Sequence, residues 1–277
     1  MNGSVRLVRP RNDMSLFSHA WSMLSMVLKA EMDGLRAYID LDLKELQTYR
    51  DYYTGEERRG IYYDADAFRE FGSNLWDWCF DQPHEVIPDD GMDETRSFID
   101  AEFPCYFKYN TMDSGDVKYK RSIIPRLLRV KQAVLSRSQD LFGSHDLDPH
   151  KTIAFLYRAN NKCGECVVRP LSAYFSVLDA AVCRYPAFKV WFQTDSLVAV
   201  SEFRKRYKDS VSVSHFETIN DPRGWVEQFS PRSGYQRAID AASLMFMLSR
   251  CAVLLRNFSN LADMSAALST GEDIMLL

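Results

Sequence analysis

The second half of the chain alternates short apolar runs with amphipathic helical stripes, and this alternation restricts the fold more than any other feature. Each apolar run ends in polar residues and leads into a helical pattern. The predicted strands are 153–158, 189–193, 211–214 and 252–255, and the predicted helices are 170–184, 197–207, 235–248 and one that follows residue 259. Strands that alternate with helices favour a doubly wound parallel sheet.

The first residues of the chain predict a smaller unit of the same kind. A strand at 5–8 precedes a helical stripe that starts at Leu16, and a second strand follows at 35–41. Strand, helix and strand in this order form a βαβ unit with parallel strands. Pro125 is predicted to begin a helix that runs to about residue 142. A polar stretch then suggests two α/β domains, residues 1–147 and 148–277.

Composition places the chain among ordinary globular proteins. Its 277 residues are 46% hydrophobic and 26% charged, and the net charge of −4 argues against a general nucleic-acid binder. No apolar run has the length of about 18 residues that a membrane span requires, and the N-terminus lacks the features of a signal peptide. Six cysteines in a chain of this length suggest a reducing, cytoplasmic location. The one CxxC, Cys163 to Cys166, is better explained as structural or incidental than as a redox pair.

Several predicted strand ends in the second half carry groups suited to a nucleotide diphosphate. Arg158 could hold phosphates with paired hydrogen bonds, and Asp195 could accept hydroxyl groups of a ribose or sugar. Phe216 could stack on a base, while Ser259 lies at a helix N-terminus that favours anions. The complete candidate donor-binding set is Arg158, Asn160, Asp195, Ser196, Phe216, Asn257, Phe258 and Ser259.

Each of these residues also has a structural interpretation. Arg158 could pair with a nearby carboxylate, the polar residues Asp195, Ser196 and Ser259 could cap helices, and Phe216 could belong to the core. Their shared position along one edge of a parallel sheet favours the functional interpretation of the set, because ligands bind outside the carboxyl ends of such strands.

An aromatic and acidic cluster lies in the first half. Trp76, Trp78 and Phe80 alternate with Asp77 and Asp81. Aromatic faces beside carboxylates suit carbohydrate, because rings stack on sugar C–H surfaces and carboxylates accept hydroxyl hydrogen bonds. Large aromatic side chains are also commonly buried in a core. The sequence leaves both interpretations open.

Other common catalytic motifs are not found in the sequence. It contains no GxGxxG, no GxxxxGK[ST], no GxSxG and no HExxH. Asp40 and Asp42 form a DxD pair at a predicted strand end, where two carboxylates could hold Mn²⁺ and a diphosphate. Acidic residues are frequent in this chain, so chance explains the pair better.

Three segments of the second half resemble the donor-binding domain of fucosyltransferase-like glycosyltransferases of the GT-B architecture. They are FLYRANN, VWFQTDSLVAVSEFRKRY and AIDAASLMFMLSRCAVLLRNFSNLADMSAAL, within residues 150–270. Tyr157 departs from the family pattern, which has His-x-Arg after this strand. The chain also resembles the small soluble glycosyltransferases of large algal viruses, which include xylosyltransferases that use UDP-xylose.

The resemblance implies two Rossmann-like domains with parallel sheets facing a cleft, and an inverting, metal-independent transfer without a cofactor. The donor, UDP-xylose or GDP-fucose, would bind residues 148–277, and a glycan acceptor would bind residues 1–147. Arg158 would neutralise the leaving diphosphate. A carboxylate would deprotonate the acceptor hydroxyl; Asp13 is the first choice, with Asp77 and Asp81 in reserve.

Two alternatives remain open at this point. One is a metal-dependent GT-A transferase that uses Asp40 and Asp42. The other is a carbohydrate-binding protein without catalytic activity.

Overall fold

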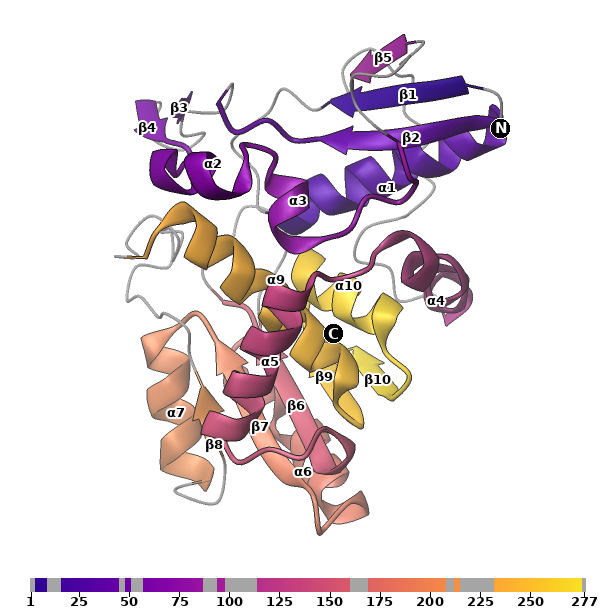
Figure 1. Ribbon diagram of the computed structural model, residues 1–277. Helices are drawn as coiled ribbons and strands as arrows, with labels where there is room; N and C mark the ends of the chain where they lie inside the picture. Colours follow the sequence, from indigo (N-terminus) through magenta and orange to yellow (C-terminus); the bar gives the residue numbers. More distant parts are fainter. Residues whose placement is uncertain are drawn as a thin grey trace. The chain divides into compact units, whose positions relative to one another are not determined.

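The computed structural model describes residues 3–8, 16–44, 48–50, 57–86, 94–97, 114–159, 169–207, 212–214 and 232–275 (Figure 1). The chain forms two compact units. Unit 1 comprises Met1–Leu135 with Arg232–Ala242, and unit 2 comprises Ser136–Pro231 with Ser243–Leu277. The domain boundary between residues 147 and 148 stays a prediction.

Unit 1 contains a three-stranded parallel sheet in the order β2-β1-β5. Its strands are β1 (Gly3–Val8), β2 (Leu35–Asp40) and β5 (Glu94–Ser97). Helix α1 (Leu16–Met32) connects β1 to β2 and is buried along most of its length, so the predicted βαβ unit is confirmed. The other elements are the antiparallel pair β3 (Thr48–Arg50) and β4 (Glu57–Arg59), and helices α2 (Ala65–Phe71), α3 (Leu75–Cys79) and α4 (Ser114–Leu127).

Side chains cover the outer edge of β2, which pairs with β1 alone among the described strands. Gln82 accepts a hydrogen bond from the Ile39 N–H at 2.8 Å and donates one to the Ile39 carbonyl at 2.9 Å. Nδ1 of His84 accepts the Ala37 N–H at 3.0 Å. These side chains satisfy backbone groups that an exposed edge would otherwise offer to another strand.

The prediction of one helix beginning at Pro125 is wrong. Pro125 lies in the last turn of α4, and a separate helix, α5 (Gln132–Ser144), follows. The break has a physical cause, because the intervening backbone pairs with the end of α3 and the residues that follow it. The Asp81 N–H donates to the Arg129 carbonyl and the Lys131 N–H donates to the Cys79 carbonyl, both at 2.9 Å.

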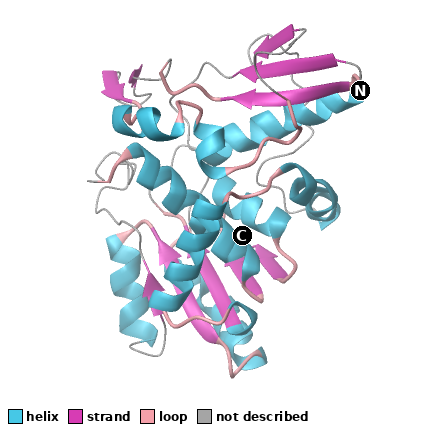
Figure 2. Cartoon of the chain, viewed as in Figure 1, coloured by secondary structure: helices cyan, strands magenta, loops and turns pink. Residues whose placement is uncertain are grey.

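Unit 2 contains a five-stranded parallel sheet in the order β10-β9-β6-β7-β8. Figure 2 draws the strands as magenta arrows and the helices in cyan. The strands are β6 (Thr152–Tyr157), β7 (Lys189–Thr194), β8 (Ser212–Ser214), β9 (Val253–Arg256) and β10 (Glu272–Met275). The helical elements within unit 2 are η1 (Pro149–Lys151), η2 (Leu171–Tyr174), α6 (Phe175–Arg184), α7 (Leu197–Tyr207) and α10 (Asn260–Leu268). Helices α5 and α9 (Gly234–Arg250) begin in unit 1 and continue into unit 2. The predicted alternation is confirmed, and β10 is an additional strand.

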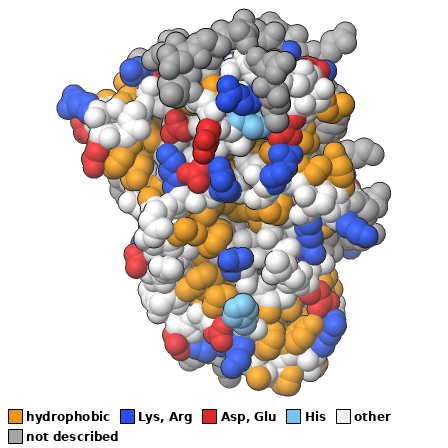
Figure 3. All heavy atoms as spheres, turned by 45° about the vertical axis from the view of Figure 1, so that its right-hand side comes forward, with side chains coloured by type: hydrophobic (Ala, Val, Ile, Leu, Met, Phe, Trp, Pro, Cys, Tyr) orange, Lys and Arg blue, Asp and Glu red, His pale blue; other side chains and the backbone are white. Residues whose placement is uncertain are grey.

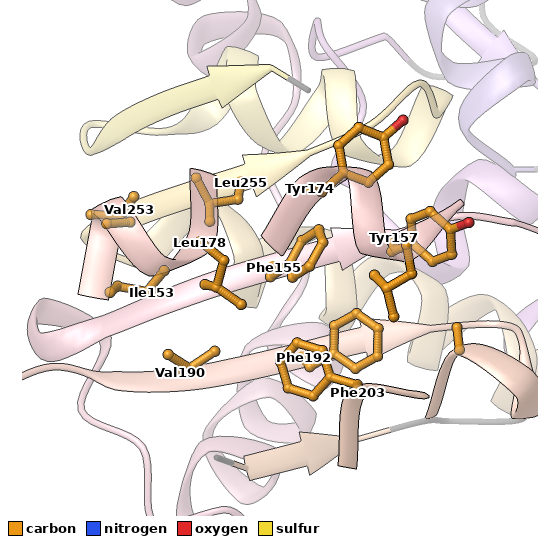
Figure 4. Close-up of a cluster of buried hydrophobic side chains, with 13 residues drawn as sticks. Ile153, Phe155, Tyr157, Tyr174, Leu178, Val190, Phe192, Phe203, Val253 and Leu255 are labelled. Carbon is orange, nitrogen blue, oxygen red and sulfur yellow. The ribbon is translucent and has the colours of Figure 1, made fainter. Parts of the chain in front are cut away.

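Strand β6 is buried on both faces. Ile153 and Phe155 belong to one apolar cluster, and Ala154 and Leu156 belong to another on the opposite face. In the first cluster the rings of Phe192 and Phe203 stack 3.9 Å apart, which packs α7 against the sheet (Figure 4). Burial on both faces explains why β6 reads as a continuous apolar run.

A buried ion cluster joins β9, α10 and β10. Nε of Arg256 lies 2.7 Å from Oδ1 of Asp273, and Nη2 lies 3.0 Å from Oδ2. Nη1 lies 2.6 Å from Oδ1 of Asp263. The exposed fractions of the three side chains are 1% for Arg256, 9% for Asp273 and 2% for Asp263. Burial lowers the pKa of Arg256, but the bonds and charges of the two carboxylates raise it by more, so the guanidinium stays charged.

We expect Arg256→Met to lower the free energy of unfolding by about 3–5 kcal/mol, because it leaves two buried carboxylates without their cation. Urea denaturation monitored by circular dichroism measures this loss. The matched control is Arg69→Met, which breaks the pair between Arg69 and Asp66, whose side chains are 82% and 93% exposed. This control should stay near wild type. Equal losses in both variants would contradict a structural role of the Arg256 cluster.

Candidate functional site

Three polar residues follow neighbouring strands of unit 2 at the same edge of the sheet. Asn257 comes directly after β9, Arg158 after β6 and Asp195 after β7. Strands β7 and β8 are added in chain order on one side of β6, whereas β9, the next strand in the chain, lies on the other side of β6. The order therefore reverses between β6 and β9, and a reversal of this kind marks the usual ligand position in an open parallel sheet.

The Asn257 side chain bonds to the backbone of Arg158 on both sides of its Cα. Oδ1 accepts the Arg158 N–H at 2.8 Å, and Nδ2 donates to the Arg158 carbonyl, also at 2.8 Å. The Asn257 N–H donates to the Leu156 carbonyl at 3.3 Å. The end of β9 thus holds the backbone that leaves β6.

Asp195 binds the same segment from β7. Its Oδ1 accepts the Ala159 N–H at 3.0 Å, and its Oδ2 lies 2.8 Å from Nε of Arg158. The Arg158 side chain is 24% exposed and that of Asp195 is 7% exposed. The pairing of Arg158 with a carboxylate, which the sequence raised as an alternative, is therefore present. A partly exposed arginine fixed in this way can also bind an anion with the rest of its planar fork.

The serine candidates cap helices. Oγ of Ser196 accepts the Ala199 N–H in the first turn of α7 at 3.3 Å. Oγ of Ser259 accepts the Ala262 N–H at the N-terminus of α10 at 3.5 Å. Both caps begin helices directly after a strand of the sheet, which places two helix N-termini at the edge that carries Arg158.

Some predicted site residues lie outside the described part of the chain. They are Asp13, Asn160, Phe216 and the Cys163 to Cys166 motif. Phe258 is described and half-buried, between Asn257 and Ser259.

The aromatic cluster of unit 1 belongs to the core. Trp76, Trp78 and Phe80 are buried. The indole N–H of Trp76 donates to the Asp81 carbonyl at 3.0 Å, and that of Trp78 donates to the Gly72 carbonyl at 2.8 Å. Of the two interpretations left open by the sequence, core packing is confirmed for these three aromatic residues.

Asp77 receives three hydrogen bonds from unit 1. Its Oδ2 accepts from Nδ2 of Asn74 at 3.0 Å and from the hydroxyl of Tyr38 at 3.3 Å. Its Oδ1 accepts from Nε2 of Gln82 at 2.8 Å. Burial raises the pKa of Tyr38 and the charge of Asp77 adds to this rise, so the phenol stays a donor. Asp81, the other reserve acid, is exposed.

The DxD pair is engaged within unit 1. Oδ2 of Asp40 accepts from Nε of Arg6 at 2.7 Å, and Oδ1 of Asp42 accepts the Lys44 N–H at 2.9 Å. Across the described residues, no three or more His, Cys, Asp or Glu side chains come together as a set that could hold a metal ion. A metal at Asp40 would have to displace the Arg6 guanidinium.

The surface carries charges of both signs. On the face shown in Figure 3, basic and acidic side chains intermingle with hydrophobic ones. Within the described part of the chain, every helix is too short or too polar to traverse a lipid bilayer.

Sequence reasoning found the positions at the sheet edge but missed how they interact. Asn257 was predicted as a ligand contact, whereas its amide bonds to the Arg158 backbone, 99 residues earlier in the chain. Asp195 was predicted to accept ligand hydroxyls, and here it accepts the Ala159 N–H. No local sequence signal encodes a contact over this separation; only the strand order brings these residues together.

Neither a family model nor a curated protein matches this chain. Solved structures do. POFUT1 in complex with GDP has a TM-score of 0.50 and 10% identity, with 99% of this chain and 98% of that chain covered. A variant of FUT1 from Arabidopsis thaliana in complex with GDP also has a TM-score of 0.50 and 10% identity, with 100% and 71% covered. NodZ alpha-1,6-fucosyltransferase soaked with GDP-fucose has a TM-score of 0.48 and 16% identity, with 95% and 92% covered.

At these identities the likeness concerns the fold. The expected fold class is confirmed: an α/β chain with two parallel sheets that is GT-B-like and matches fucosyltransferase structures. The expected cleft between the two sheets stays a prediction.

We expect Asp77→Ala to lower the free energy of unfolding by about 1–3 kcal/mol, because Asn74, Gln82 and Tyr38 each lose the hydrogen bond that they donate to this carboxylate. Asp81→Ala removes an exposed carboxylate of the same kind and should change stability little. Urea titration of both variants gives the comparison. If Asp77→Ala were as stable as Asp81→Ala, the hydrogen bonds of Asp77 would not contribute to stability.

Proposed function

We propose that this protein is a glycosyltransferase that moves a sugar from a nucleotide diphosphate to a hydroxyl group of a glycan, in N-glycan or polysaccharide synthesis. The observation that carries the proposal is the placement of Arg158 where the strand order of unit 2 reverses, with the backbone of residues 158–159 bound by the residues that follow both neighbouring strands. An arginine there offers a planar pair of donors to a diphosphate. The fold likeness to fucosyltransferases supports the same reading.

The donor that we propose first is a GDP-sugar such as GDP-fucose. Both solved structures with a TM-score of 0.50 described above contain GDP, and another structure of POFUT1 contains GDP-fucose. UDP-xylose is the second choice, on the resemblance of the sequence to small viral xylosyltransferases. The two donors share the diphosphate, so Arg158 serves either one. They differ in the base, for which Phe216 is the proposed stacking partner.

The proposed transfer inverts the anomeric centre and uses no metal ion. A carboxylate takes the proton of the acceptor hydroxyl, and the oxygen attacks the anomeric carbon. The bond from that carbon to the diphosphate breaks, and the diphosphate leaves with the electron pair. Negative charge builds on the leaving oxygens, and Arg158 stabilises it by a charge-assisted hydrogen bond that is stronger in the transition state.

The remaining site residues take proposed roles around this step. Residues 148–277 would bind the donor, with Asn160, Ser196, Phe258 and Ser259 beside the diphosphate and sugar. Residues 1–147 would bind the acceptor and supply the base. Asp13 is the proposed base. Asp77, as the reserve, would first have to give up hydrogen bonds that it accepts in unit 1.

We expect Arg158→Ala to weaken GDP or UDP binding and to lower kcat by roughly a hundredfold or more, because the loss of one charge-assisted contact costs on the order of 2–4 kcal/mol. Arg158→Lys should recover part of both losses, since an ammonium group lacks the planar fork. Calorimetric titration with GDP and UDP and turnover of GDP-fucose and UDP-xylose measure these effects.

The same measurements distinguish the alternatives. All assays are run in EDTA and repeated with Mn²⁺. Activity that appears only with Mn²⁺ would favour a metal-dependent enzyme that uses Asp40 and Asp42. Binding of a glycan without hydrolysis or transfer of either donor would identify a carbohydrate-binding protein. A wild-type protein that binds neither nucleotide would refute the proposed function.

We expect Asp13→Asn to lower kcat by about 10²–10⁴ while donor affinity stays unchanged, because a general base acts on the acceptor. If Asp13 only caps a helix, Asp13→Asn should stay active and as stable as wild type, because Asn caps a helix as well as Asp does, and Asp13→Ala should be active and about 1 kcal/mol less stable. Turnover and thermal unfolding of the same preparation separate these outcomes. A fully active Asp13→Asn enzyme would remove Asp13 from the mechanism, and Asp77→Asn and Asp81→Asn would then be tested in the same way.

A further inference from the structure

We propose that Asn257 is a positioning residue that acts on the donor through Arg158 and does not contact the donor itself. The inference rests on the proposed function, because it assigns to Arg158 the binding of a diphosphate. It changes the role of Asn257 from a ligand contact to a support of the residue that makes the contact.

The bonds of the Asn257 amide support this role. Its oxygen accepts the Arg158 N–H and its nitrogen donates to the Arg158 carbonyl, each at 2.8 Å. Asn257 is buried, and its own N–H donates to the Leu156 carbonyl at 3.3 Å. Both functional groups of the amide therefore serve the residue at the end of β6. A neighbouring strand would satisfy the N–H and carbonyl of a residue in the same way. The Asn257 amide therefore takes the place of a strand partner for Arg158, the first residue after β6.

Asn257 itself has little freedom to move. It directly follows Arg256, whose guanidinium is bound in the buried cluster with Asp263 and Asp273. It is followed within two residues by Ser259, the N-cap of α10. Fixed structure on both sides gives Asn257 a defined position from which to hold Arg158.

A second contact holds the Arg158 segment from the opposite side. Asp195, at the end of β7, accepts the Ala159 N–H at 3.0 Å and places its other oxygen 2.8 Å from Nε of Arg158. The backbone of residues 158–159 is thus bound by the strands on both sides of β6. Rotation of this backbone would redirect the whole arginine side chain. Misplacement of a positioned group by about 1 Å can cost on the order of a hundredfold in rate.

The chemistry of an amide is specific to this task. Asp at position 257 could still accept the Arg158 N–H, but its second oxygen would face the Arg158 carbonyl, and two acceptors repel. A protonated carboxyl group could donate to that carbonyl again. Asn257→Asp should therefore bind nucleotide more weakly than wild type at neutral pH, and part of the loss should be recovered as the pH is lowered toward about 4, where a carboxyl group takes up a proton.

The test is a double-mutant cycle on nucleotide affinity. Calorimetry gives the Kd of whichever of GDP or UDP the wild-type protein binds more tightly, for Asn257→Ala, Arg158→Lys and the double variant. We expect Asn257→Ala to raise Kd about tenfold in the wild-type protein and less than about twofold in the Arg158→Lys variant, because the effects of substitutions at coupled residues on binding free energy are not additive. Thr152→Val is the matched control. It removes the 2.6 Å bond from the Thr152 hydroxyl to the Asp148 carbonyl at the other end of β6 and should leave Kd unchanged.

Hydrogen exchange of the Arg158 and Ala159 amides, measured without nucleotide, tests the same idea independently of the proposed function. Asn257→Ala should accelerate exchange at Arg158, whereas Thr152→Val should not. The same rise in Kd in both backgrounds would mean direct contact or general destabilisation and would overturn the proposal. Unchanged exchange at Arg158 would also overturn it. Faster exchange in a protein that binds neither GDP nor UDP would support the positioning of Arg158 by Asn257 and refute the proposed function alone.

Discussion

Burial of β6 on both faces is the constraint on which unit 2 depends. Phe155 and Leu156 point into separate apolar clusters on opposite faces, so the strand has no solvent-facing side on which to carry a polar group. The first position where a charged side chain can lie without a large desolvation cost is the residue after the strand ends. Arg158 occupies that position. The apolar core thus fixes where the chemistry of this unit can be placed.

The buried Arg256 cluster contributes the second fixed point. Within a core, an ion pair gains little net stability over apolar packing, because desolvation of the charges offsets their attraction. Its effect here is geometric. Two bonds to Asp273 and one to Asp263 define the rotation of Arg256 and tie the end of β9 to β10 and α10. An apolar side chain at the same position could fill the volume, but it would make no directional bonds and would not fix the position of the next residue, Asn257.

The fold was predictable where the periodicity was strong. Strands β6, β7 and β9 are apolar runs, and their helices carry clear stripes, so parallel topology followed from their order. Strand β10 has the sequence EDIM, so it lacked an apolar run to reveal it. The break after α4 depended on backbone pairing with residues distant in sequence, which a local proline rule does not include. For the site, the expected parallel topology placed Arg158, Asp195, Asn257 and Ser259 along one edge of the sheet. The hydrogen-bond partner of each polar atom could not be predicted from the sequence, because an amide or carboxylate at a strand end can bind a ligand or a backbone group equally well.

The strand order of unit 2 also governs the order in which this unit can fold during synthesis. Strand β6 pairs with β7, which is close in sequence, but its other neighbour is β9, roughly a hundred residues later. Until residues 253–256 leave the ribosome, one edge of the most apolar strand has no partner. Contacts of such long sequence separation slow folding, and an unpaired apolar edge invites association with other chains. A nascent or truncated chain that ends before β9 would therefore expose an aggregation-prone edge, and chaperone binding at that stage would have a direct physical cause.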